Sequence, residues 1–125
     1  MKVALGIVVY ENKILLIKRK KREGDLLWAF PGGKFDENLD NSIQDTVVRE
    51  VKEETGVNVV VKNLIAKKET EQTTLFYFEC DFISQSSKYS TDEVLEVSFY
   101  SYEKMLKLVT TQIYPPVLEF IKNRI

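Results

Sequence analysis

The sequence predicts an α+β domain in which a mixed or antiparallel sheet carries helices on its faces. Segments rich in β-branched and aromatic residues outnumber the helical segments. The expected order, β-β-β-α-β-β-β-α-α, has no regular alternation of strand and helix, which would favour a parallel sheet. The length of 125 residues suits one hydrophobic core, so we expect residues 1–125 to form a single domain.

The first third of the chain is expected to contain three strands. A β-branched strand, Lys2–Tyr10, and a second strand, Ile14–Arg19, flank a short polar turn and are predicted to form a hairpin. The basic stretch "KRKKREGD" is expected to be a loop, and Leu26–Phe30 a short apolar strand that Pro31 ends. Residues 32–41 are also expected to be loop.

The following helix is marked at both ends. Ser42 is a good N-cap, and Gly56 suits the left-handed position that follows the last turn. At about 100° per residue, the apolar residues of the helix fall on one stripe and three glutamates fall on an adjoining stripe. The apolar stripe is Ile43, Val47, Val48 and Val51, and the acidic stripe is Glu50, Glu53 and Glu54. The acidic stripe therefore borders the buried face of the helix instead of lying opposite to it.

The second half of the chain is expected to add three strands and two helices. Strands are predicted at Val57–Ala66, Thr73–Ile83 and Glu96–Tyr102, with a polar loop at Ser84–Glu93. A short helix is predicted at Glu103–Val109. The last helix, Pro115–Ile125, begins with two prolines, which the first turn of a helix tolerates.

Composition limits the partners that the protein is expected to bind and the side chains that are available for catalysis. The net charge of −1 gives no indication of a nucleic-acid or acidic-membrane partner. The one cysteine, Cys80, lies in an apolar stretch and is expected to be a buried thiol. No apolar run approaches the roughly 20 residues of a membrane span, and we see no signal peptide, so a cytoplasmic protein is expected. Because the chain has no histidine, acid–base chemistry must use carboxylates, Lys, Tyr, Cys or a metal-bound water.

The three helical glutamates need a compensating positive charge. Like charges three and four residues apart on a helix repel each other. Glu50, Glu53 and Glu54 have this spacing, and together they direct several carboxylate oxygens toward one point. Hard divalent cations such as Mg²⁺ prefer such oxygen ligands. The spacing alone leaves two interpretations open, a metal site or a solvated acidic face that Arg49 and Lys52 neutralise in part.

A longer pattern decides between the two interpretations. The stretch "REVKEETGV" (Arg49–Val57), with "PGGK" (Pro31–Lys34) before it, resembles the Nudix box of the Nudix hydrolases, G-x5-E-x7-R-E-U-x-E-E-x-G-U, where U is apolar. The matching region runs from residue 33 to residue 57. The resemblance implies the Nudix-type α/β/α sandwich with a mixed β-sheet, which is consistent with the predicted order of elements.

The chain departs from the Nudix box at one position. Counted back from Arg49, the first glutamate of the box corresponds to Asn41. Seven residues, 34–40, separate Gly33 from this position, where the box has five. The loop is therefore two residues longer, and Asp40 or Glu37 is a candidate to replace the missing carboxylate in space.

The resemblance implies a divalent metal site on the helix. Glu50 and Glu54 would be the main ligands, and Glu53 a third ligand or one that binds through water. A backbone carbonyl at Gly32 or Gly33 would complete the set. The implied cofactor is Mg²⁺, with Mn²⁺ as a possible replacement.

The implied reaction is hydrolysis of a nucleoside diphosphate linked to another group. Water attacks a phosphorus atom, metal ions neutralise the phosphate oxygens, and a carboxylate accepts the proton. Arg49 would orient the glutamates. Glu50 is the first candidate for the base, and Glu93 and Glu96 are alternatives that also have an ordinary interpretation as surface charges.

Substrate contacts are expected from the residues before the box, Gly32 among them. Arg19 and Lys20, in the basic run, occupy the place where relatives contact phosphates, although a soluble charged loop explains them equally well. Trp28 and Phe30 are expected to face opposite sides of their short strand, so that one can stack on a base. Phe30 is favoured as a core residue.

The substrate class is the least constrained part of the prediction. The compact chain resembles MutT-type members, which cleave (deoxy)nucleoside triphosphates to monophosphate and pyrophosphate. Tyr114 stands where some of them hold a base-reading Asn, which argues against a specialist for 8-oxo-dGTP. ADP-ribose or another sugar nucleotide is the alternative, disfavoured because the chain begins directly at its first strand.

Other classes of function are weighed against hydrolysis. A non-catalytic Nudix-fold nucleotide-binding module is a further alternative, although the glutamate set that such modules usually lose is intact here. An RNA decapping enzyme has little support, because no extended basic and aromatic surface is visible. We therefore expect a nucleotide-type small molecule as ligand, no membrane and no stable nucleic-acid partner, in a monomer or homodimer.

Overall fold

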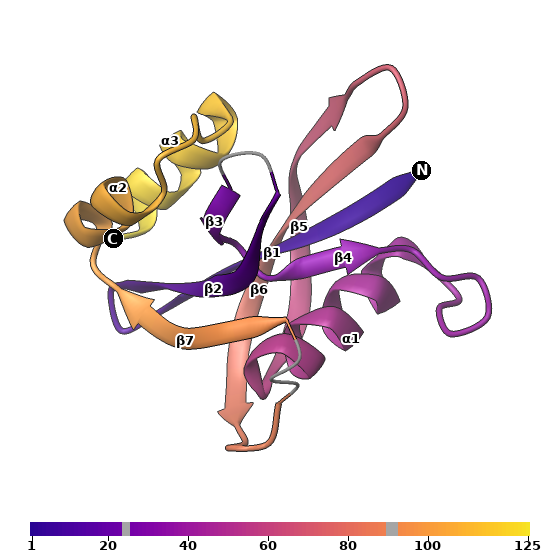
Figure 1. Ribbon diagram of the computed structural model, residues 1–125, viewed down its shortest axis with the longest axis horizontal. Helices are drawn as coiled ribbons and strands as arrows, with labels where there is room; N and C mark the ends of the chain where they lie inside the picture. The colour runs from indigo at the N-terminus through magenta and orange to yellow at the C-terminus, as the bar shows by residue number, and fades with distance from the viewer. Residues whose placement is uncertain (24–25, 90–92) are drawn as a thin grey trace.

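The computed structural model of the protein describes residues 1–23, 26–89 and 93–125. Its elements are β1 (Lys2–Tyr10), β2 (Lys13–Glu23), β3 (Leu26–Ala29), β4 (Gly32–Lys34), α1 (Ile43–Thr55), β5 (Val57–Glu69), β6 (Thr74–Gln85), β7 (Val94–Tyr100), α2 (Tyr102–Leu108) and α3 (Pro115–Arg124). Figure 1 shows α1 on one side of the strands and α2 with α3 on the other.

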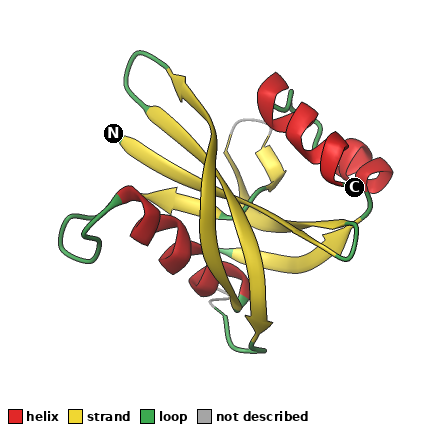
Figure 2. Ribbon diagram, turned by 180° about the vertical axis from the view of Figure 1, so that it is seen from behind, coloured by secondary structure: helices red, strands yellow, loops and turns green. Residues whose placement is uncertain are grey.

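The sheet is mixed, as the sequence predicts. Its main path is β3-β2-β1-β6-β5, while β4 pairs with β1 and β7 pairs with β2. The central strand β1 runs parallel to β6 and antiparallel to β2 and β4. Figure 2 shows the same arrangement from behind, with the helices on both faces of the strongly twisted strands. The α+β prediction with a mixed sheet is therefore confirmed.

Two hydrophobic clusters join the helices to the sheet. One lies under α1 and includes the fully buried Val47 and Val51 together with Phe78 of β6. The other lies under α2 and α3 and includes Met105 and Ile121. The first cluster holds α1 against the sheet beside β4, which is where the candidate site is built.

The predicted hairpin and helix ends are confirmed. In the β1–β2 hairpin Tyr10 pairs with Lys13. The backbone N–H of Asp45 donates to the side chain of the N-cap Ser42 at 3.2 Å, and Gly56 has a φ of 77° after the last turn of α1. These local signals are reliable because each satisfies backbone groups that the helix leaves unpaired.

Several predicted boundaries are wrong. The basic run is not a loop, because β2 continues to Glu23 and pairs with β3 and β7, although residues 24 and 25 of the predicted loop lie outside the described residues. The predicted loop 32–41 begins with β4, which pairs with β1. Strand β5 extends to Glu69 by pairing with β6, and β7 begins at Val94. In the first three cases the partner strand extends a segment whose own sequence is polar or glycine-rich, whereas β7 gains the apolar Val94 and Leu95.

Two predictions of burial have different outcomes. Val48 is 36% exposed instead of buried, because at about 100° per residue it lies beyond the edge of the stripe formed by Val47 and Val51. Cys80 is buried, as predicted, and burial raises the pKa of its thiol to about 12.

Among the described residues, no helix is both long and apolar enough to cross a membrane.

Candidate active site

A cleft of about 1150 Å³ lies beside α1, β4 and the first residues of β1. Two different groups of side chains line it. One group is charged and includes Arg19, Arg49, Glu50 and Glu54. The other is aromatic and includes Trp28, Phe30, Tyr77 and Tyr114, which pack together in the cluster under α2 and α3.

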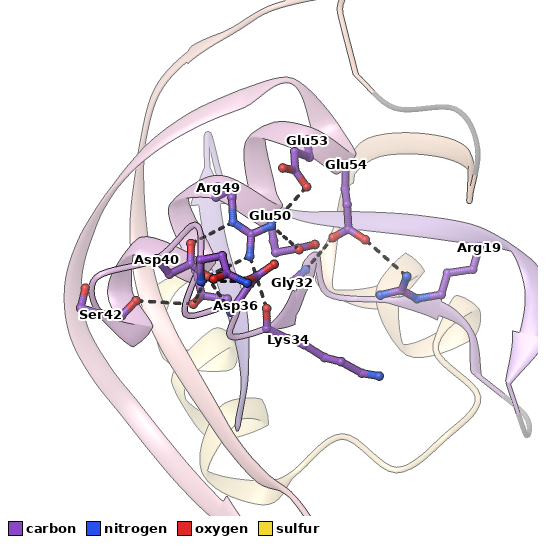
Figure 3. Close-up of polar contacts among 12 residues, drawn as sticks. Arg19, Gly32, Lys34, Asp36, Asp40, Ser42, Arg49, Glu50, Glu53 and Glu54 are labelled. Atoms are coloured by element: carbon purple, nitrogen blue, oxygen red, sulfur yellow. Dashed lines mark hydrogen bonds and ion pairs between the residues drawn. The ribbon is translucent and has the colours of Figure 1, made fainter. Parts of the chain in front are cut away.

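Glu54 is the most buried acidic residue of the cleft. It is only 8% exposed, and burial raises the pKa of its carboxyl group to about 7. Its Oε1 accepts a hydrogen bond from the backbone N–H of Gly32 at 2.7 Å, and its Oε2 accepts one from Nη1 of Arg19 at 3.3 Å (Figure 3). The end of α1 is thereby joined to both β4 and β2.

Glu50 lies one helical turn before Glu54, over the backbone of β4. A Cβ atom placed on Gly33 would be 2.5 Å from Cδ of Glu50, so the carboxylate occupies this position only because residue 33 has no side chain. Burial raises the pKa of Glu50, while its hydrogen bond from Nη1 of Arg49 at 2.8 Å acts in the opposite direction. Two carboxylates thus share a poorly solvated region where their charges repel each other.

Arg49 is held in place by Asp40. Nε and Nη2 of Arg49 each donate to one carboxylate oxygen of Asp40 at 2.9 Å, and the hydroxyl of Thr46 donates to Oδ2 at 2.8 Å. The Arg49 guanidinium holds the pKa of Asp40 well below its ordinary value, although burial acts to raise it. In turn, the Asp40 carboxylate raises the pKa of Arg49. Figure 3 shows this network between the loop and α1.

The longer loop supplies a different carboxylate near the position of the missing first glutamate of the box. Asn41 is exposed, and its backbone N–H donates to Asp45 at 3.0 Å as part of the helix cap. Of the two candidate replacements, Glu37 is exposed, whereas Asp40 is 4% exposed and carries the contacts with Arg49. The carboxylate that faces Arg49 therefore comes from the residue before the expected position.

Glu53 does not join the other two glutamates in the cleft. Its side chain is 51% exposed and lies 3.4 Å from Nη1 of Arg49. Within residues 1–23, 26–89 and 93–125, no three acidic, histidine or cysteine side chains converge closely enough to hold a metal ion. The metal role of Glu53, direct or through water, thus stays a prediction.

The residues that remain fit a hard divalent cation. Glu50 and Glu54 offer only oxygen atoms, they crowd negative charge into a partly buried region, and the backbone of Gly32 and Gly33 lies against them. A divalent ion would relieve the repulsion between the two carboxylates, and waters or substrate oxygens would complete its coordination. The donor set is therefore suited to Mg²⁺ or Mn²⁺.

The other predicted contact residues divide into two groups. Arg19, Trp28, Gly32 and Glu93 line the cleft, as does Tyr114. Lys20 and Glu96 do not line it: Lys20 is exposed, and Oε1 of Glu96 lies 3.9 Å from the ammonium group of Lys18. The structure therefore supports Glu93 over Glu96 as a second candidate base, and Arg19 over Lys20 as a phosphate contact.

The prediction that Trp28 and Phe30 face opposite sides is wrong. Both pack against the cluster under α2 and α3, and both line the cleft. The physical reason is that side chains two residues apart in an extended segment share a face. Phe30 is 8% exposed and belongs to the core, as favoured, whereas Trp28 is half-buried and makes an edge contact with Tyr100.

The sequence analysis missed most of the aromatic and apolar lining. Leu5, Leu75, Tyr77 and Ile113 come from β1, β6 and the segment between α2 and α3. The alternation of β6 identifies Leu75 and Tyr77 as sharing a face, but not which side of the sheet that face lies on. Only the pairing of β6 with β1 places them beside the charged residues.

Comparisons with known proteins agree with this architecture. An ADP-ribose pyrophosphatase of Methanocaldococcus jannaschii is 45% identical over 60 residues, which is 48% of this chain and 34% of the relative. An 8-oxo-dGTP diphosphatase of Buchnera aphidicola is 37% identical over 59 residues, which is 46% of this chain and 44% of the relative. The matched part thus spans less than half the length of either relative.

A solved structure matches over nearly the whole chain. An ADP-ribose pyrophosphatase from Streptococcus suis superposes with a TM-score of 0.72 at 27% identity, covering 95% of this chain and 90% of that one. The sequence model of the NUDIX domain matches residues 1–120. Because that match covers almost the entire chain and includes the helix with its glutamates, this protein belongs to the NUDIX domain family.

Proposed function

We propose that the protein is a divalent-metal-dependent hydrolase that cleaves a nucleoside triphosphate to the monophosphate and pyrophosphate. The observation that carries the proposal is a single cleft that combines the buried carboxylate of Glu54 and the partly buried carboxylate of Glu50 with a cluster of four aromatic residues. The carboxylates suit metal-bound phosphates, and the aromatic cluster suits a planar base. The family and the names of the relatives support a pyrophosphohydrolase.

In this proposal Glu50 and Glu54 would hold Mg²⁺, which would neutralise phosphate oxygens and lower the pKa of the attacking water. Water forms a new bond to a phosphorus atom, the bridging P–O bond breaks, and the leaving phosphate keeps the bridging oxygen. Glu50 accepts the proton of the water, with Glu93 as the second candidate for this role. Arg49, which Asp40 holds in turn, donates to Glu50 and keeps its carboxylate in place.

The aromatic part of the cleft would receive the base. Tyr77 and Tyr114 lie with ring centroids 5.8 Å apart, and Trp28 and Phe30 lie in the same cluster. A base in contact with these rings would leave its phosphates near Arg19 and the glutamates. Such a division of the cleft favours nucleotides over phosphate compounds without an aromatic group.

ADP-ribose is the second candidate substrate. Two of the relatives described above are named ADP-ribose pyrophosphatases, and the cleft of about 1150 Å³ is somewhat larger than most small-molecule sites. A volume of this size suits a substrate with sugars or bases on both sides of the diphosphate.

The test is a product analysis with purified protein and Mg²⁺ or Mn²⁺. The panel contains canonical and oxidised dNTPs, ADP-ribose, diadenosine polyphosphates and sugar nucleotides, and ³¹P NMR identifies the bond that is cleaved. Glu54→Gln is compared with Glu71→Gln, which removes the same charge from an exposed residue. We expect Glu54→Gln to lower kcat by at least about a hundredfold and Glu71→Gln to change it little.

The outcomes separate the candidate functions. Release of pyrophosphate from triphosphates supports the main proposal, and release of AMP from ADP-ribose alone supports the second candidate. Tight nucleotide binding without cleavage, with either metal, would instead identify a non-catalytic binding module. Full activity of Glu54→Gln would refute the assigned role of the carboxylate.

A further inference from the structure

The two carboxylate oxygens of Glu54 are both engaged by the protein. Oε1 accepts from the backbone of Gly32, and Oε2 accepts from Arg19 of β2. The backbone contact fixes the orientation of the carboxylate, while the contact with Arg19 supplies a positive charge. A metal ion that binds Oε2 must therefore either share this oxygen with Arg19 or displace Arg19 from it.

The two arginines near the glutamates are held very differently. Arg49 makes two hydrogen bonds to the buried Asp40, at 2.9 Å each, as well as one to Glu50. Across the described residues, the guanidinium of Arg19 has a single side-chain hydrogen bond, the longer one of 3.3 Å to Glu54. Arg49 is thus a fixed part of the site, whereas Arg19 can move away after losing one contact.

Arg19 is also placed where a polyphosphate would lie. Its side chain is 21% exposed and lines the same cleft as Glu50 and Glu54. A buried carboxylate needs a nearby positive charge, and one positive charge next to it opposes the approach of another. A phosphate group in the cleft offers the guanidinium an alternative partner with charge-assisted hydrogen bonds.

We propose that Arg19 exchanges one anionic partner for another. Its guanidinium neutralises Glu54 before metal binds, and it contacts the substrate phosphates once metal and nucleotide are bound together. The proposal rests on the proposed function and adds an exchange of partners. Arg19 would weaken binding of metal alone and strengthen binding of phosphate once metal is present. Metal and substrate would therefore bind cooperatively, because each removes Arg19 from the position that opposes the other.

The test measures Mn²⁺ affinity without nucleotide, by EPR titration of the full chain at constant pH. Three variants are compared with the natural protein. Arg19→Gln removes the charge next to Glu54, Arg19→Lys keeps it, and Lys18→Gln removes the charge of the neighbouring residue, whose ammonium faces Glu96. Thermal unfolding of each variant establishes that it is folded.

We expect Arg19→Gln to bind Mn²⁺ roughly three- to tenfold more tightly. Arg19→Lys and Lys18→Gln should stay within about twofold of the natural protein. With Mn²⁺ saturating, calorimetry should show the opposite order for imidodiphosphate, a non-hydrolysable diphosphate, which should bind Arg19→Gln more weakly. Damage to the fold alone would weaken both affinities, so the opposite directions identify the exchange.

The failure of this proposal is distinguishable from the failure of the proposed function. Unchanged or weaker Mn²⁺ binding by Arg19→Gln, while Glu54→Gln loses binding, would overturn the exchange and leave the metal site intact. Equal Mn²⁺ affinity in the natural protein and Glu54→Gln would overturn the metal site and the exchange together.

Discussion

Replacing Asp40 by Asn tests how the longer loop supports the site. The substitution keeps the size of the side chain but removes its charge, and it places an NH₂ group among donors. Oδ2 of Asp40 accepts from both Arg49 and Thr46, and Oδ1 accepts from Nε of Arg49. In Asp40→Asn, at least one of these donors therefore faces another donor.

The expected loss of stability follows from burial and from the number of contacts. Breaking a buried ion pair by removing one partner costs about 3–5 kcal/mol of the free energy of unfolding. The Arg49 side chain is 20% exposed and keeps its contact with Glu50, so the lower end, about 3 kcal/mol, applies. For a chain of this size, that corresponds to a fall in Tm of roughly 10 °C.

The assay is urea denaturation of the metal-free protein at several pH values. The pKa of Asp40 is depressed in the folded state, so its stabilising effect is present above the ordinary value of 3.8 and is lost as the pH falls below it. The difference between the natural protein and Asp40→Asn should thus be full at pH 7 and shrink at pH 3. The control Glu37→Gln, an exposed residue of the same loop, should cost less than about 0.5 kcal/mol.

Two results would refute this reasoning. A loss below about 1 kcal/mol at pH 7 would mean that the contacts of Arg49 with the helix suffice without Asp40. A difference that does not change between pH 7 and pH 3 would mean that the charge of Asp40 is not the cause of the stability.

Three further predictions concern the same region and the core. Gly33→Ala should weaken Mn²⁺ binding at least about tenfold but lower Tm little, because the new methyl group meets the end of the Glu50 side chain and not the backbone; a large loss of Tm would contradict this. Because burial raises the pKa of Glu54 from 4.5 to about 7, its contribution to stability is full below pH 4.5 and is lost as the pH rises through 7. In EDTA, urea denaturation should thus show the natural protein losing about 2 kcal/mol relative to Glu54→Gln between pH 5 and pH 8, and an unchanged difference would show that the carboxyl group is solvated. Cys80 should not react with a thiol reagent at pH 8 until the protein unfolds, since it is buried and its pKa is about 12, and rapid labelling of the folded protein would show that the strand opens.

The parts of the site that lie close together in the sequence were predictable. Ser42 and Gly56 set the ends of α1, and the helical spacing of Glu50 and Glu54 brings both carboxylates to one cleft. Helical periodicity and capping depend only on neighbouring residues, so they can be predicted without knowledge of the rest of the fold. The same periodicity led to the wrong prediction that Val48 lies on the buried stripe, whereas this residue lies past its edge and is partly exposed.

The parts that join distant segments needed the tertiary structure. Strand pairing turned the basic run after Arg19 into strand, and it also brought Arg19 to Glu54, 35 positions later in the chain. The loop departure at Asn41 could not be interpreted from spacing, because only the folded loop shows which carboxylate faces Arg49.

By itself, the sequence determined the class of fold, the helix with its glutamates and the oxygen-rich chemistry of the site. The tertiary structure decided which residues surround those glutamates: Asp40 behind Arg49, Arg19 against Glu54, and an aromatic wall across the cleft. The physical reason is that a helix repeats within a few residues, whereas the partners of a side chain in a mixed sheet depend on the register and order of strands far apart in the chain.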